Sequence, residues 1–140
     1  MALVNSKELL LDAQKNHYAV GAFNVENMEM MQAVIAAAEA ENAPVILQTT
    51  PSTLRYADTS LYSAMAKAVA EKASVTVAIH LDHGSSFDLC EKAAKDGYTS
   101  LMIDGSKLSL DENIALTKKV VEYAHERGVV VEAELGTLAG

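Results

Sequence analysis

Short apolar runs alternate with longer segments of helical periodicity along the whole chain of 140 residues. Each apolar run has the length of a strand, and the segment after it repeats its apolar residues at helical spacing. One strand and one helix together take roughly 25–30 residues, the size of a strand–helix–strand crossover unit. This pattern predicts an α/β fold of parallel strands joined by crossover helices. The predicted strands cover residues 18–25, 45–50, 75–82, 100–104 and 129–135.

Two architectures are built from this repeat. A doubly wound sheet of five strands would be complete at this length. A closed (β/α)₈ barrel, the TIM barrel, needs about 250 residues, so the chain would supply its N-terminal half plus one strand. The length alone suits either architecture, and the distribution of polar residues has to distinguish them.

The predicted strands carry polar side chains on one face, near their carboxyl ends. Alternate residues of a strand point to the same face, so His80 and Asp82 share a face that opposes Ile79 and Leu81. In a doubly wound sheet, polar groups belong only to the two strands beside the switch point, because helices cover both faces. Polar residues on every strand therefore favour the mouth of a barrel. The five residues concerned are Asn24, Thr50, Asp82, Asp104 and Glu134.

Three of these five residues are acidic, which indicates a bound cation. Asp82, Asp104 and Glu134 would bring three negative charges together, and buried carboxylates are costly unless they are paired or bind a metal. His83 directly follows Asp82, and a neutral imidazole is a good zinc ligand. A carboxylate beside it could shuttle a proton. The alternative is that these groups satisfy one another by hydrogen bonds and perform no chemistry.

Composition excludes several classes of function. The net charge of −8 argues against nucleic acid as the main partner. No apolar run reaches the roughly 20 residues of a membrane span, and the N-terminus lacks the basic start and apolar stretch of a signal peptide. The single cysteine, Cys90, excludes an internal disulfide and fits a reducing compartment. We therefore expect a cytoplasmic protein with no nucleic acid or membrane partner.

Five stretches of the chain match one enzyme family in order and spacing. Together they span almost the whole chain, and their combination is far more specific than any one of them. On these stretches the chain resembles the N-terminal half of the class II, zinc-dependent ketose-bisphosphate aldolases, the fructose- and tagatose-bisphosphate aldolase family. The matching stretches are Tyr18–Asn24, Ala43–Leu47, His80–Ser86, Ser100–Ser106 and Val131–Gly136.

The resemblance implies a (β/α)₈ barrel that reversibly cleaves a ketose 1,6-bisphosphate to dihydroxyacetone phosphate and an aldehyde, usually glyceraldehyde 3-phosphate. It also implies a catalytic Zn²⁺ that polarises the ketone and stabilises the enediolate. His83 matches a catalytic zinc ligand, and Asp82 matches the acid–base residue for the C4 hydroxyl. Asp104 and Glu134 match carboxylates that hold a second or alternative metal position in some members. The substrate-contacting positions match Asn24 and Thr50.

The rest of the family's site is expected outside this chain. Two further histidine ligands of the zinc, the glycine-rich phosphate loop and a monovalent-cation site belong to the absent C-terminal half. A catalytic zinc needs about three protein ligands. We therefore interpret residues 1–140 as the N-terminal part of a single barrel domain that would be incomplete and inactive alone. The full-length protein is expected to be a dimer or tetramer that acts on a phosphorylated sugar.

Three choices stay open. Fructose and tagatose bisphosphate differ only at C4, and Gly84–Ser86 looks more like the fructose-type members, since tagatose-type members often carry a second histidine at Gly84. The alternative function is a self-contained, doubly wound domain that binds a metal or small anion without catalysis. A third possibility is a half-barrel that serves only as an assembly piece, with its fifth strand as an exposed edge.

Overall fold

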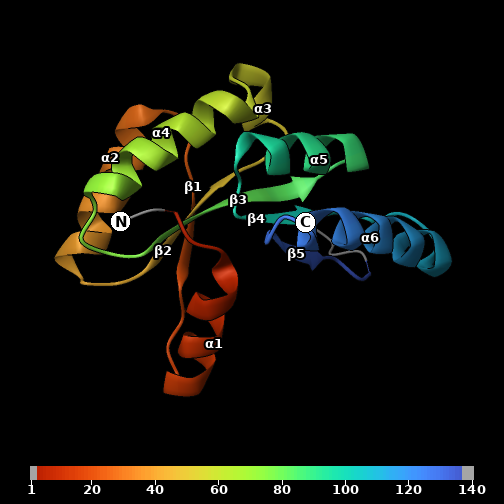
Figure 1. Cartoon of the computed structure of the whole chain (residues 1–140), viewed down its shortest axis with the longest axis horizontal. Helices are drawn as coiled ribbons and strands as arrows, with labels where there is room; N and C mark the ends of the chain where they lie inside the picture. Colours follow the sequence, from red (N-terminus) through yellow and green to blue (C-terminus); the bar gives the residue numbers. More distant parts are fainter. Residues whose placement is uncertain (1–2, 137–140) are drawn as a thin grey trace.

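The chain folds around one five-stranded sheet in which every neighbouring pair of strands is parallel (Figure 1). Its structure, a computed structural model, describes residues 3–136, so the first two and last four residues of the predicted domain lie outside the described residues. The strands follow one another across the sheet in chain order. They are β1 (Gly21–Asn24), β2 (Val45–Thr49), β3 (Val77–Gly84), β4 (Ser100–Ile103) and β5 (Val130–Ala133).

Helices connect the strands, and capping side chains set where most of them begin. Asn27, Asp58, Ser86 and Ser109 each accept a hydrogen bond from a backbone N–H of the first turn. These bonds satisfy donors that have no partner inside a helix. The helices are α1 (Ser6–Asn16), α2 (Met28–Ala40), α3 (Thr53–Tyr56), α4 (Thr59–Lys72), α5 (Phe87–Asp96) and α6 (Leu110–His125).

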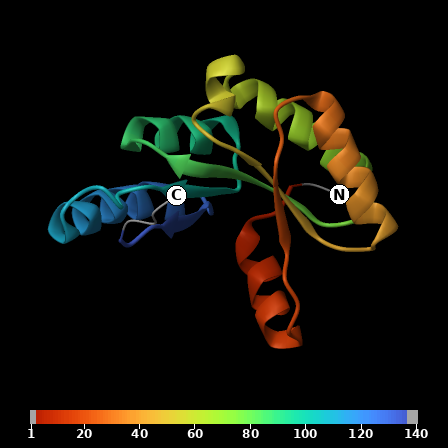
Figure 2. The same cartoon turned by 180° about the vertical axis from the view of Figure 1, so that it is seen from behind.

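The long helices that follow the strands, α2, α4, α5 and α6, all pack on one face of the sheet (Figures 1 and 2). The main core lies between them and the sheet, where Leu47, Ile79 and Leu101 are fully buried. A doubly wound sheet would change its strand order at a switch point and carry crossover helices on both faces. The sequential strand order and the placement of all four long crossover helices on one face therefore exclude that alternative. They match about half of a (β/α)₈ barrel, as predicted.

Helix α1 lies on the opposite, inner face, near the amino ends of the strands. Its Leu9 forms a small apolar cluster with Ile46 and Ala78. One turn earlier, Ser6 Oγ donates to Ser100 Oγ at the start of β4, at 3.1 Å. A small apolar cluster and a serine pair thus cover part of the inner face near its amino end, and the ionisable side chains lie towards its carboxyl end.

Some elements differ from the sequence prediction. Strand β1 begins at Gly21 rather than at residue 18. Strand β3 continues to Gly84 instead of ending at Asp82, with a register shift against β4 between Leu81 and Gly84. The sequence pattern also fails to predict α3, because a single helical turn is too short to show a 3.6-residue period.

Candidate active site

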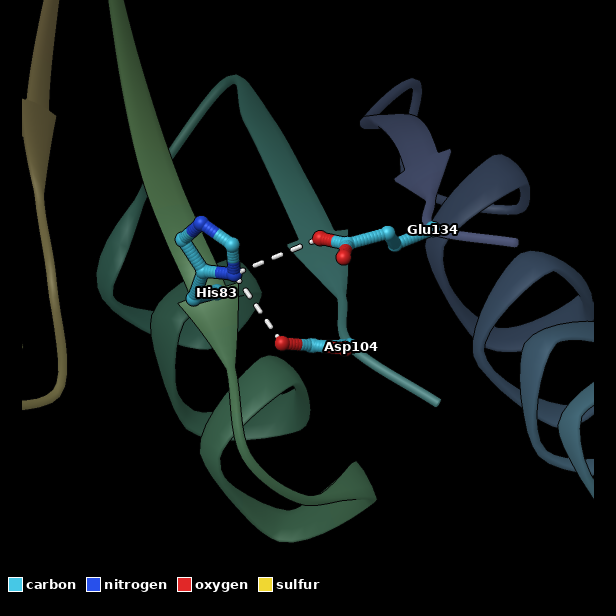
Figure 3. A group of neighbouring side chains, drawn as sticks. All are labelled: His83, Asp104 and Glu134. Carbon is cyan, nitrogen blue, oxygen red and sulfur yellow. Dashed lines mark hydrogen bonds and ion pairs between the residues drawn. The ribbon is translucent and has the colours of Figure 1, made fainter. Parts of the chain in front are cut away.

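Three side chains from three strand ends meet at the carboxyl end of the sheet (Figure 3). His83 is the penultimate residue of β3, Asp104 follows the end of β4, and Glu134 follows the end of β5. The Nδ1 atom of His83 lies 3.0 Å from Oδ2 of Asp104 and 3.6 Å from Oε2 of Glu134. The structure thus brings together the three residues that we predicted as metal ligands.

The backbone of His83 explains how its side chain reaches this cluster. Strict alternation would point His83 away from the face that carries Asp82. Instead His83 has a φ of 50°, in the left-handed region, where β3 shifts register against β4. A non-glycine residue in that conformation costs about 1–3 kcal/mol and persists only where its surroundings enforce it. The strained backbone turns the imidazole towards the two carboxylates.

Gly84 holds this irregular strand end against β4. A Cβ atom on Gly84 would lie 2.5 Å from the carbonyl oxygen of Met102 and 2.9 Å from Sγ of Cys90. The carbonyl oxygen of Gly84 accepts a hydrogen bond from the backbone N–H of Asp104 at 2.9 Å. Only a residue without a side chain permits this approach. The glycine therefore fixes the backbone of Asp104 beside that of His83.

Hydrogen bonding sets opposite charges on two members of the cluster. Two bonds from Ser106, from its hydroxyl and its backbone N–H, together with the bond to His83, lower the pKa of Asp104 to about 2. The bond to Asp104 raises the pKa of His83 above its usual value. Charge-assisted bonds of this kind are stronger than neutral ones. Without a metal, His83 is therefore protonated and Asp104 ionised together over a wider pH range than the same two groups would be if they were far apart.

Asp82 lies beside the cluster and is held by the side-chain amide of Gln48, a residue to which the sequence analysis assigned no role. Nε2 of Gln48 donates to Oδ2 of Asp82 at 2.9 Å and to Oδ1 of Asn24 at 2.7 Å. The other oxygen of Asp82, Oδ1, lies 3.9 Å from Nε2 of His83. Gln48 thus links two of the predicted site residues. Its inward position on β2 was the signal that could have identified it.

The structure shows Thr50 in a different set of contacts. Its hydroxyl bonds to Ser52 Oγ at 2.6 Å and to Thr53 Oγ1 at 3.2 Å. Thr53 in turn donates to Oε1 of Glu26 at 2.8 Å. Thr50 therefore stands with the loop that leads into α3, at the same end of the sheet but outside the Asn24–Gln48–Asp82 network.

His80 occupies the inner face one step closer to the amino ends of the strands. It is 6% exposed, its Nδ1 lies 2.8 Å from Ser100 Oγ, and its Nε2 lies 3.6 Å from Oε2 of Glu132. Burial lowers the pKa of His80 to about 4 and raises the pKa of Glu132. His80 is therefore a buried residue beneath the cluster and is neutral at pH 7.

The cluster has the donor set of a metal centre. One ligand atom from each of His83, Asp104 and Glu134 lies within 4.8 Å of the other two. An imidazole nitrogen with carboxylate oxygens is a set that Zn²⁺ accepts. The residues present therefore fit a divalent ion such as zinc.

Sequence comparison decides the family of the chain. The family model described as "Fructose-bisphosphate aldolase class-II" matches residues 4–140. The chain belongs to the class II fructose-bisphosphate aldolase family. The fructose-bisphosphate aldolase of Staphylococcus aureus strain Mu50 is 51% identical over 144 residues, which cover 100% of this chain and 50% of the relative. The enzyme of that name from Geobacillus stearothermophilus is 50% identical over 143 residues, with the same two coverages.

Solved structures of aldolases agree with this assignment. The YdjI aldolase from Escherichia coli K12 has a TM-score of 0.90 at 40% identity, over 96% of this chain and 52% of that one. The fructose-bisphosphate aldolase of Campylobacter jejuni, at 23% identity, shares the fold with a TM-score of 0.87, over 99% of this chain and 47% of its own. The chain spans about half the length of the class II aldolases that it matches.

Proposed function

We propose that the chain is the N-terminal part of a class II aldolase barrel that reversibly cleaves fructose 1,6-bisphosphate to dihydroxyacetone phosphate and glyceraldehyde 3-phosphate. The observation that carries this proposal is the meeting of His83, Asp104 and Glu134 beside Asp82. It lies where (β/α)₈ enzymes place their active sites, at the carboxyl ends of the strands. The family membership and the names of the relatives support the reaction type.

His83, Asp104 and Glu134 are the residues of this chain that would hold zinc. When bound, Zn²⁺ supplies Lewis acidity towards the carbonyl oxygen of the substrate. Further zinc ligands and a monovalent-cation site would come from the remaining part of the barrel. In this proposal Asp104 and Glu134 serve a second or alternative metal position, and His83 serves the catalytic one.

Asp82 would hold and move the proton of the C4 hydroxyl. Its Oδ2 is fixed by the Gln48 amide, while Oδ1 faces the imidazole of His83 at 3.9 Å. The bond from Gln48 keeps the carboxylate in one orientation, so the group is preorganised for proton transfer. Asn24 shares the same amide and would contact substrate. Thr50 would contact substrate from the loop before α3.

Gly84 is typical of the fructose-type members, which supports fructose bisphosphate over its C4 epimer, tagatose bisphosphate. Tagatose-type members often carry a histidine at this position. A side chain here would collide with the carbonyl oxygen of Met102, 2.5 Å from a Cβ atom. The backbone of β4 would have to move, and Asp104 would move with it. The present arrangement of strand ends therefore suits the fructose-type sequence.

The setting of the protein is also part of the proposal. Residues 1–140 would form one part of a single barrel domain, in a homo-oligomer of two or four subunits. Within residues 3–136, no helix is long and apolar enough to cross a bilayer. The family suggests the cytoplasm as the compartment and a phosphorylated sugar as the partner.

A fusion of this chain to the C-terminal half of the Staphylococcus aureus relative would test the proposal. His83→Ala should remove most of the bound zinc and nearly all of the cleavage activity. Asp82→Ala should keep zinc but lower kcat by about 10²–10⁴-fold, the usual contribution of an acid–base group. His125→Ala, at the end of α6, is the control and should change neither. Normal kcat in Asp82→Ala, or full zinc in His83→Ala, would contradict the assigned roles.

A further inference from the structure

Asn113 is a buried amide on α6 that reaches across to the end of β5. Its side chain is 7% exposed. Nδ2 donates to the backbone carbonyl oxygen of Glu134 at 2.8 Å, and Oδ1 accepts from Thr117 Oγ1 at 3.2 Å. The bond from Thr117 fixes which end of the amide faces Glu134. The donor is therefore aimed at the backbone of a candidate metal ligand.

The same amide lies against the residue that follows Asp104. A Cβ atom on Gly105 would lie 2.3 Å from Oδ1 of Asn113 and 2.7 Å from its Cγ. Gly105 thus packs directly on the amide through its bare backbone. One side chain contacts the backbone segments that carry both carboxylates of the cluster, Asp104 and Glu134.

Helix formation does not explain this asparagine. Asparagine is a weaker helix former than leucine or alanine, and the start of α6 is already capped by Ser109 and Glu112 in a reciprocal pair of bonds. Glu134 lies beyond the last residue of β5, Ala133, where the ladder with β4 has ended. The bond from Asn113 therefore holds the backbone of Glu134 where hydrogen bonds between β4 and β5 no longer do so.

We propose that Asn113 is a positioning residue that sets the separation of the Asp104 and Glu134 carboxylates, and with it the size of the metal ion that the cluster accepts. This inference rests on the proposed metal site. Zinc forms short bonds of about 2.0–2.2 Å to nitrogen and oxygen, so its ligands must be held close together. Residues that orient metal ligands typically contribute 10- to 100-fold to metal affinity.

The test is a calorimetric titration of the 140-residue chain with Zn²⁺ and with Cd²⁺, a larger ion of the same charge. Asn113→Leu keeps the branching of the side chain and adds no charge, but it cannot donate to Glu134. We expect it to weaken zinc binding by about 10-fold or more and to weaken cadmium binding less. Gly105→Ala should shift the ratio in the same direction, because its methyl group would push the amide away.

Two controls separate positioning from general destabilisation. Val120→Ala removes a buried side chain from the same helix, so it should lower stability and leave the zinc-to-cadmium affinity ratio unchanged. Thr117→Val removes only the bond that orients the amide and should give a smaller shift than Asn113→Leu. Unchanged zinc affinity in Asn113→Leu, or an equal loss for both ions, would overturn the inference.

A further measurement distinguishes failure of this inference from failure of the proposed metal site. If the unaltered chain takes up no more zinc than its His83→Ala variant, the metal site itself is wrong. The carbonyl ¹³C resonance of Glu134 in the metal-free chain then tests Asn113 alone. A shift in Asn113→Leu supports the positioning contact, and an unmoved resonance overturns it.

Discussion

The imidazole Nδ1 of His83 lies 3.0 Å from Oδ2 of Asp104, although the two residues end different strands and are 21 positions apart. Two features create this contact. His83 adopts a left-handed backbone conformation, and Gly84 lets β3 approach β4 closely enough to share a bond with the N–H of Asp104. The contact determines how the cluster responds to pH and to substitution.

Asp104→Asn should lower the pKa of His83 towards its ordinary value, because a neutral amide would replace the charged acceptor that raises it most. The imidazole Cε1–H resonance, followed through a pH titration of the metal-free chain, measures this pKa. A His83 pKa that does not change in Asp104→Asn would show that the 3.0 Å contact does not persist in solution.

The same pair should stabilise the metal-free fold within a defined pH window. Because the pKa of His83 is raised in the folded chain, its contribution to stability is fully present below the unfolded pKa of 6.5. This contribution is lost as the pH rises through the folded pKa. Because the pKa of Asp104 is lowered, its contribution to stability is present above the unfolded pKa of 3.8. This contribution is lost as the pH falls through about 2. Chemical denaturation should therefore show the largest difference in stability between the unaltered chain and Asp104→Asn from pH 3.8 to pH 6.5. A difference that is constant from pH 3 to 9 would contradict this pairing.

His80 should weaken the fold in acid. Its folded pKa of about 4 is below its ordinary 6.5, so the unfolded chain binds the proton more tightly and stability falls as the pH drops from 6.5 to 4. The loss due to this residue is on the order of 3 kcal/mol. His80→Asn can retain the bond to Ser100 without titrating. Its urea midpoint should depend less on pH over this range, and an identical pH dependence would refute the prediction.

Gly84→Ala should destabilise the chain by about 1–3 kcal/mol, as overpacking of a tight contact usually does. The added methyl group would meet the backbone of Met102 rather than a movable side chain. Gly21→Ala is the matched control, since its methyl group would meet only the half-exposed ring of Phe23. Equal urea midpoints for the two variants would argue against a rigid contact at Gly84.

Gln48→Leu should release Asp82 and Asn24 from their shared amide. In the fused aldolase we expect kcat to fall by about 10- to 100-fold, the size of effect that misplacement of a reacting group produces. Zinc content should stay the same, because Gln48 contacts none of the three candidate ligands in the described structure. Gln14→Leu on α1 serves as the control. Unchanged kcat in Gln48→Leu would remove the orienting role.

Much of the architecture could be read from the sequence by periodicity. Alternating apolar runs and helical segments predicted the five parallel strands. Local rules succeed here because a strand or helix repeats its signal over several residues. Inward polar positions also predicted that Asp82, Asp104 and Glu134 would gather at one end of the sheet.

The sequence by itself determined which residue types stand at the strand ends, whereas the tertiary structure decided which of them touch. The turn of His83 towards Asp104 contradicts simple alternation, because a left-handed residue and a register shift reverse its direction. Likewise, the contacts of Gln48 with Asp82 and of Asn113 with Glu134 join segments 34 and 21 residues apart. Such contacts depend on how strands and helices are packed against one another, and no local sequence period encodes that packing.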